Sequence, residues 1–218
     1  MLSRGNKKKD NNNKNSLVSL ETTDLPPDPY RHFSVWLEDA FRANIIEPNA
    51  MSLATSSKSG DCSIRTVLLK MFDENGFVFF SDYQSTKAKA IDENPHVALL
   101  FPWLKLERQV KITGIASRIS RKESLSHYLS RPRGRGKGSW INQQRSIVIS
   151  RKLMELKLDE IKSRFSKGDV SVPEVWGGYL IKPVSFEFWQ RKSKESNDRY
   201  IYTQNADAHW EYSQSSEC

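Results

Sequence analysis

The sequence has few of the residues that mark a cross-linked, metal-bound or membrane-spanning protein. It contains two cysteines among 218 residues, Cys62 and Cys218, and they form no C-x-x-C pair. A disulfide framework or structural zinc site is therefore not expected, and a reducing cytoplasm is the default location. The four histidines are scattered, so we expect no metal site. No stretch reaches the roughly 18 apolar residues that a membrane helix needs.

Several catalytic motifs are also missing. The sequence has no G-x-S-x-G nucleophile elbow and no paired-carboxylate motif, so nothing favours a hydrolase. The segment 131–140, RPRGRGKGSW, is not a Walker A loop, because Gly138 separates Lys137 from Ser139. This stretch could be an RNA-binding arginine–glycine patch. A basic anion-binding loop is the more economical interpretation, because arginine forks fit phosphate oxygens.

Positive charge is what the sequence has in excess. Lysine and arginine total 34 against 26 acidic residues, a net charge of +8. Such a balance suits binding to nucleic acid, an anionic membrane or a phosphorylated small molecule, and charge alone does not choose among them. Residues 1–22 are rich in lysine and asparagine and lack the apolar core of a signal peptide, so we expect a disordered basic tail. Residues 23–218 are expected to form one folded domain.

Hydrophobic periodicity predicts a chain made mostly of strands. Apolar residues at helical spacing predict an amphipathic helix from Tyr30 to about Ala43. Strands are expected at residues 51–55, 63–71, 76–81, 96–102, 108–117, 176–181, 186–190, 199–203 and 209–212, with a hairpin turn at 73–76. Further helices are expected at 85–94, 121–130 and 150–165. The pattern favours a mostly β fold with helices (α+β), a closed or nearly closed barrel.

Seven short motifs occur between residues 24 and 212. They are Asp24-Leu25-Pro26 to Asp28-Pro29, Arg65-x-Val67-Leu68-Leu69-Lys70, Phe101-Pro102-Trp103, Glu107-Arg108-Gln109-Val110, Ser130-Arg131-Pro132-Arg133, Trp176-Gly177-Gly178 and Phe186-x-Phe188-Trp189-Gln190. Their order and spacing resemble those of the pyridoxine/pyridoxamine 5′-phosphate oxidase family. The resemblance implies an FMN-binding split β-barrel and a homodimer with FMN at the subunit interface.

The resemblance also implies an activity. The family passes a hydride from the C4′ carbon of pyridoxamine or pyridoxine 5′-phosphate to FMN. Oxygen then reoxidises the flavin, which yields hydrogen peroxide and pyridoxal 5′-phosphate. Neither nucleic acid nor a membrane is expected as a partner of such an enzyme.

Family positions map onto a set of candidate site residues in this chain. Those implied to bind FMN are Arg65, Thr66, Val67, Leu68, Lys70, Phe80, Ser81, Lys87, Gln109, Gln144, Trp189 and Arg199. Those implied to bind substrate are Lys70, Tyr128, Arg131 and Arg135. The resemblance identifies no catalytic residue, and Arg199 is the nearest candidate.

The substrate half of the resemblance is altered. Glu195 and Asn197 stand where the family has the arginine and histidine that cover the substrate ring. His127 stands in place of a phosphate-pocket tyrosine, and Arg135 in place of a serine. We therefore expect FMN binding with weakened or redirected oxidase activity. Two alternatives stay open: a related flavin oxidase of the phenazine-biosynthesis type, and a non-catalytic protein that holds FMN or pyridoxal phosphate.

Overall fold

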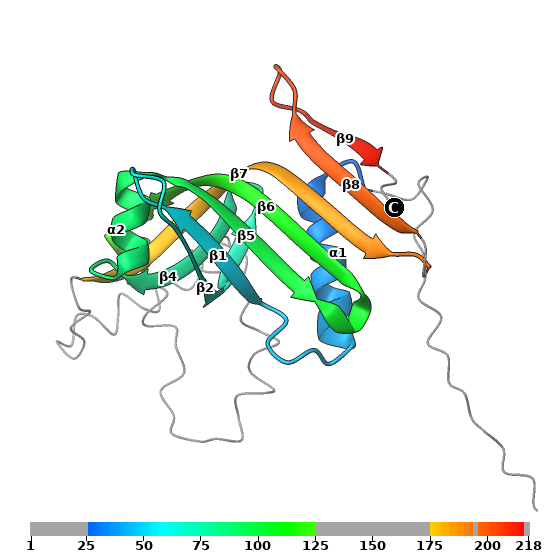
Figure 1. The fold of residues 1–218 in the computed structure, drawn as a ribbon, viewed down its shortest axis with the longest axis horizontal. Coiled ribbons are helices and arrows are strands. Elements are labelled where there is room, and N and C mark those ends of the chain that lie inside the picture. The colour runs from blue at the N-terminus through cyan, green and yellow to red at the C-terminus, as the bar shows by residue number, and fades with distance from the viewer. Residues whose placement is uncertain (1–25, 125–174, 194–195, 216–218) are drawn as a thin grey trace, which may run out of the picture.

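A nine-stranded antiparallel sheet dominates the computed structural model, which describes residues 26–124, 175–193 and 196–215 (Figure 1). The strands are β1 (Ala50–Ser56), β2 (Cys62–Leu68), β3 (Met71–Asp73), β4 (Gly76–Asp82), β5 (His96–Trp103), β6 (Arg108–Arg118), β7 (Trp176–Arg191), β8 (Asn197–Gln204) and β9 (Trp210–Ser215). The helices are α1 (Pro29–Arg42), α2 (Thr86–Glu93) and the short 3-10 helix η2 (Leu104–Leu106). The strand order is β2-β1-β5-β6-β7-β4-β3, and β8 pairs with β7 and β9. The expected mostly β, α+β fold is confirmed.

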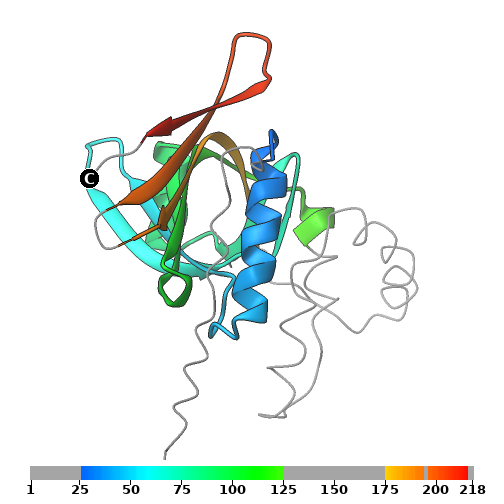
Figure 2. The same ribbon diagram turned by 90° about the vertical axis from the view of Figure 1, so that its right-hand side faces the viewer.

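Helix α1 begins where the sequence predicts. The side chain of Asp28 accepts a hydrogen bond from the Tyr30 amide at 3.0 Å, and Pro29 occupies the first turn, where its missing N–H costs nothing. Its buried face carries Phe33, Trp36 and Leu37 at helical spacing. The sheet curls around this face of α1, and the helix lies along one side of the curled sheet (Figure 2).

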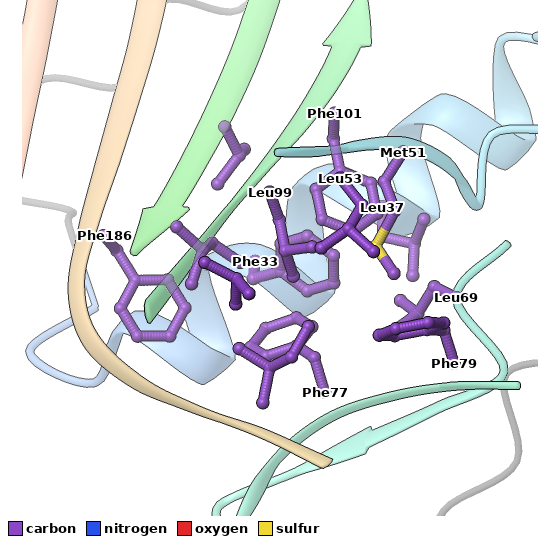
Figure 3. Close-up of a cluster of buried hydrophobic side chains, with 14 of the residues drawn as sticks. Phe33, Leu37, Met51, Leu53, Leu69, Phe77, Phe79, Leu99, Phe101 and Phe186 are labelled. Atoms are coloured by element: carbon purple, nitrogen blue, oxygen red, sulfur yellow. The ribbon is translucent and has the colours of Figure 1, made fainter. Parts of the chain in front are cut away.

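The core between α1 and the sheet is rich in aromatic rings (Figure 3). Phe33 packs edge-on against Phe77 and Phe101, with ring centroids 4.9 Å apart in each pair. Strands β1, β4, β5 and β7 contribute Met51, Leu53, Phe79, Leu99 and Phe186, all fully or almost fully buried. Burying each such side chain stabilises the fold by about 1.5–3 kcal/mol, so this cluster holds the sheet curled around α1.

The prediction of two strands at 176–181 and 186–190 is wrong, because β7 runs unbroken between them. Its first half pairs with β4, its second half pairs with β8, and β6 pairs along both halves. Pro183, between the two predicted strands, lies opposite Gly114 where the register shifts. A Cβ at Gly114 would meet the Lys182 carbonyl oxygen at 2.5 Å, so this close passage requires glycine.

The single strand predicted at 63–71 is also wrong, because it is split into β2 and β3, which pair with β1 and β4 respectively. Between them the Leu69 amide donates to the Asn49 carbonyl and the Lys70 amide to the Val78 carbonyl, each at 2.9 Å. Buried Leu69 thus turns the chain from one part of the sheet to another. Lys70 lies outside both strands. The expectation that it shares one strand with Arg65 is therefore wrong.

The other predicted strands and the helix at 85–94 are present, with ends shifted by a few residues. Residues 121–124 are helical, as predicted. The rest of that predicted helix, the helix at 150–165 and the tail 1–22 lie outside the described residues. Within the described part of the chain, no helix is long and apolar enough to span a membrane.

Candidate cofactor site

A lysine and two serines meet where β4 ends and α2 begins. Lys87 Nζ donates to Ser81 Oγ at 3.1 Å and to Ser85 Oγ at 3.3 Å. Ser85 occupies the N-cap of α2, but its side chain accepts no capping hydrogen bond from a backbone amide of the helix and donates instead to the Asp82 carbonyl at 2.6 Å. Amides at a helix N-terminus, hydroxyls and an ammonium group together form a donor set for a phosphate. Two predicted FMN residues, Ser81 and Lys87, are therefore in direct contact.

The guanidinium of Arg65, on the edge strand β2, is a second cationic group. Its Nη1 donates to Thr55 Oγ1 at 2.8 Å and to the Leu53 carbonyl at 3.2 Å, and its Nη2 donates to Ser63 Oγ at 2.6 Å. Burial lowers the pKa of Arg65 from its ordinary value, yet an arginine remains charged at neutral pH. These bonds to β1 and β2 hold the guanidinium against the sheet rather than in open solvent.

The rest of the predicted 65–70 segment differs in exposure. Thr66 is exposed, and Val67 and Leu68 are half-buried near the end of β2. Lys70 is half-buried in the connection to β3. Together with Arg65, five predicted site residues thus belong to one continuous stretch of backbone, residues 65–70, which could line a ligand.

The Trp176-Gly177-Gly178 motif is explained by close packing at the start of β7. Trp176 stacks on Phe80, a predicted FMN residue, with centroids 4.9 Å apart and planes 14° apart. A Cβ at Gly177 would meet the Tyr83 hydroxyl at 2.2 Å, and one at Gly178 would meet an Ile119 side-chain carbon at 2.5 Å. The two glycines let β7 press against the junction of β4 and α2.

Three other predicted FMN residues form a row across the sheet. Gln109 on β6 lies directly opposite Trp189 on β7, and Trp189 lies directly opposite Arg199 on β8. All three are half-buried, whereas the alternate neighbours on these strands, such as Phe188 and Tyr200, are buried in the core. Side chains directly opposite one another lie about 4.5–5.5 Å apart at Cβ. The row therefore places an amide, a large aromatic ring and a guanidinium side by side.

Sequence reasoning missed one charged member of this surface, Glu187. Its Oε2 accepts hydrogen bonds from Arg199 Nη2 at 3.1 Å and from Lys111 Nζ at 2.5 Å. Burial alone would raise the pKa of Glu187, but the hydrogen bonds from Arg199 and Lys111 outweigh it and hold the pKa below its ordinary value. Its position two residues before Trp189 puts it on the same face of β7, which was the available signal.

Several predicted residues are not placed. Tyr128, Arg131, Arg135 and Gln144 lie outside the described residues, as do His127 and Glu195. Asn197 is described, and it lies opposite Arg191 at the start of β8. Within residues 26–124, 175–193 and 196–215, no group of three or more histidine, cysteine or acidic side chains could hold a metal ion.

Comparison with known proteins agrees with the resemblance in sequence. A family model described as pyridoxamine 5′-phosphate oxidase matches residues 37–165, and one described as the pyridoxine 5′-phosphate oxidase C-terminal dimerisation region matches residues 176–215. The pyridoxine/pyridoxamine 5′-phosphate oxidase of Crocosphaera subtropica is 54% identical over 184 residues, which cover 84% of this chain and 86% of the relative. That of Aliarcobacter butzleri is 50% identical over 194 residues, covering 89% and 92%.

Two solved structures share the fold. PhzG from Burkholderia lata, solved in complex with tetrahydrophenazine-1-carboxylic acid, superposes with a TM-score of 0.71 at 21% identity, covering 92% of this chain and 98% of PhzG. A pyridoxamine 5′-phosphate oxidase-related, FMN-binding protein from Nostoc punctiforme gives a TM-score of 0.62 at 16% identity, covering 86% and 97%. These matches confirm the expected split β-barrel. On the identity and coverage of its relatives, the chain belongs to the pyridoxine/pyridoxamine 5′-phosphate oxidase family.

Proposed function

We propose that the protein is an FMN-dependent oxidase that converts pyridoxamine 5′-phosphate and/or pyridoxine 5′-phosphate to pyridoxal 5′-phosphate, with O2 reduced to H2O2. It works as a cytoplasmic homodimer in vitamin B6 metabolism. The observation that carries this proposal is the row Gln109, Trp189 and Arg199, in a chain 54% identical to a pyridoxine/pyridoxamine 5′-phosphate oxidase. The match of residues 176–215 to a dimerisation region supports the homodimer.

The donor chemistry of the described residues fits FMN at both of its ends. A doubly charged phosphate that leaves water needs cations and hydrogen-bond donors in exchange. Lys87, Ser81 and the N-terminus of α2 supply such a set, and Arg65 adds a guanidinium on the adjacent edge. The edge atoms of a flavin ring need directed donors, which Gln109 and Arg199 supply. Trp189 between them supplies a flat apolar surface.

The protein and the cofactor have separate tasks in this reaction. FMN, when bound, supplies the acceptor for the hydride and returns the electrons to oxygen. The chain supplies alignment, exclusion of water and fixed charge. Arg199, which lies in the row beside Trp189, would donate to the edge of the flavin ring.

The presence of Asn197 supports the hypothesis that the oxidase activity is weakened or redirected to another substrate. Asn197 replaces the family histidine that covers the substrate ring, two residues before Arg199 on β8. Loss of one charge-assisted contact costs about 1.5–3 kcal/mol, or roughly ten- to a hundredfold in rate if the contact acts in the transition state. The same substitution supports the second candidate, a flavin oxidase of this fold that acts on a different, phenazine-type substrate.

Measurements on the purified protein decide among these candidate functions. The protein is purified, its flavin content is measured after denaturation, and O2 uptake and H2O2 release are recorded with each phosphorylated vitamer. FMN in the protein together with pyridoxal 5′-phosphate formation supports the oxidase. FMN without turnover on either vitamer supports the other-substrate oxidase or a non-catalytic FMN-binding homologue. A colourless protein that takes up no FMN on titration contradicts the proposal.

A further inference from the structure

Glu187 lies at the centre of a three-residue charge cluster on the outer face of β6, β7 and β8. One carboxylate oxygen, Oε2, accepts from both Lys111 Nζ and Arg199 Nη2. The side chain of Glu187 is 14% exposed, against 26% for Arg199 and 44% for Lys111. The acidic member is therefore the best shielded of the three, and solvent screens it less than it would an ion pair on the open surface.

The register shows what this contact does to Arg199. Arg199 lies directly opposite Trp189, whereas Glu187 lies directly opposite Ile201 and Lys111. The bond from Arg199 to Glu187 is therefore diagonal, and it draws the guanidinium along the sheet. A long arginine side chain has many rotamers, and an ion pair with a shielded carboxylate restricts which of them it adopts.

We propose that Glu187 is a positioning residue for the flavin site: it holds the guanidinium of Arg199 in the orientation that binds the ring edge, and Lys111 holds Glu187. The identity of the ligand in this inference rests on the proposed function. Glu187 touches neither cofactor nor substrate and acts through Arg199.

The alternative roles of Glu187 predict different results. If Glu187 mainly offset the positive charge of Arg199, its neutralisation would tighten the binding of an anionic cofactor. If it were a structural ion pair only, its neutralisation would lower stability and leave FMN binding by the folded protein unchanged. A positioning role predicts weaker FMN binding that depends on Arg199 being present.

The test is a double-mutant cycle in FMN affinity. Apo-protein is titrated with FMN, and binding is followed by the quenching of flavin fluorescence, for the wild type, Glu187→Gln, Arg199→Gln and the double variant. We expect Glu187→Gln to raise the FMN dissociation constant about tenfold, as expected when a charge-assisted bond becomes a neutral one. We expect the double variant to bind no more weakly than Arg199→Gln alone. Equal loss in both backgrounds, unchanged binding or tighter binding by Glu187→Gln overturns the inference.

Matched variants separate positioning from folding. Glu38→Gln makes the same change of charge in an exposed ion pair with Arg42 on α1, and it is expected to leave FMN affinity unchanged. Lys111→Gln is expected to weaken FMN binding a few-fold, in the same direction as Glu187→Gln. The thermal unfolding midpoint of each apo-protein is measured in parallel.

A crystal structure of Glu187→Gln supplies a readout that does not depend on affinity, namely the rotamer of Arg199. We expect Arg199 to adopt a different rotamer in this variant. An unchanged Arg199 overturns the inference. If wild-type apo-protein binds no FMN, the proposed function and this inference fail together. If it binds FMN and the cycle is additive, only this inference fails.

Discussion

The imidazole ring of His32 lies flat against the ring of Phe188, with centroids 3.8 Å apart and planes 6° apart. His32 belongs to α1 and Phe188 is the inward-facing neighbour of Trp189 on β7, so α1 supports the strand from behind the candidate flavin row. His32 Nδ1 also lies 3.1 Å from the Tyr202 hydroxyl, which donates to the Pro26 carbonyl at 3.0 Å. The row Gln109, Trp189 and Arg199 thereby lies on strands that are packed against α1 and the core.

This contact predicts a loss of stability in acid. Burial, with a smaller contribution from the charge of Arg108, lowers the pKa of His32 from 6.5 to about 3. Below pH 6.5 the unfolded chain binds a proton at His32 that the folded chain does not. Each further pH unit, down to about 3, therefore costs about 1.4 kcal/mol of unfolding free energy.

Urea unfolding of the apo-protein at pH 7.5 and 5.5 measures this effect. His32→Phe should flatten the pH dependence by about 1.4 kcal/mol over that interval, because the variant has no proton to gain. The same slope in His32→Phe and the wild type would show that His32 does not titrate as stated.

Lys87→Met should weaken FMN binding by about ten- to a hundredfold. The substitution removes the ammonium group beside Ser81 and Ser85 and so one charge-assisted contact to a phosphate. Titration of apo-protein with FMN at two salt concentrations measures this loss, and the salt dependence of binding should shrink with it. Lys89→Met, an exposed change on the same helix, is the control. Equal effects of the two variants would indicate that net charge matters and the position of Lys87 does not.

Gly177→Ala should destabilise the protein by about 1–3 kcal/mol. The added methyl group meets the Tyr83 ring, whose hydroxyl is held by the Gly178 carbonyl at 3.1 Å and whose face is covered by Arg118. Thermal or denaturant unfolding gives the loss of stability. In a Tyr83→Ala background the same substitution should cost little, because the clashing ring is gone. An equal cost in both backgrounds would place the cause in the backbone instead.

Asn197→His should raise kcat/KM for pyridoxine 5′-phosphate by about tenfold. It returns to β8 the side chain that the family uses to cover the substrate ring, at a described position opposite Arg191. Steady-state O2 uptake with both vitamers measures the change. Asn205→His, in the turn between β8 and β9, is the control, and it should leave kcat/KM unchanged. No gain from Asn197→His would mean that the histidine is dispensable in this chain.

Local patterns predicted most of the fold, and long-range packing explains what they missed. The Asp28 cap, the helical spacing of Phe33, Trp36 and Leu37, and the alternation in β6 are all visible in short windows of sequence. The continuity of β7 was not visible, because it depends on the pairing of Pro183 with Gly114 on another strand.

The candidate site shows the same division. The row Gln109, Trp189 and Arg199 follows from motifs whose spacing resembles a known family, and the pairing of three strands aligns it. The spacing of Glu187 from Trp189 indicates which face of β7 it lies on, but its partners Lys111 and Arg199 lie on other strands and became visible only in the structure. A charged residue in an alternating strand carries no local sign of which partner it will meet.

The most direct test of the proposed oxidase follows the flavin itself. FMN-loaded protein is mixed with pyridoxamine 5′-phosphate without oxygen, and its visible absorbance is recorded before and after air is admitted. The account predicts that the flavin band bleaches on addition of substrate, that pyridoxal 5′-phosphate forms in an amount equal to the flavin, and that the band returns with oxygen. A flavin band that stays unchanged with both pyridoxamine and pyridoxine 5′-phosphate would contradict it.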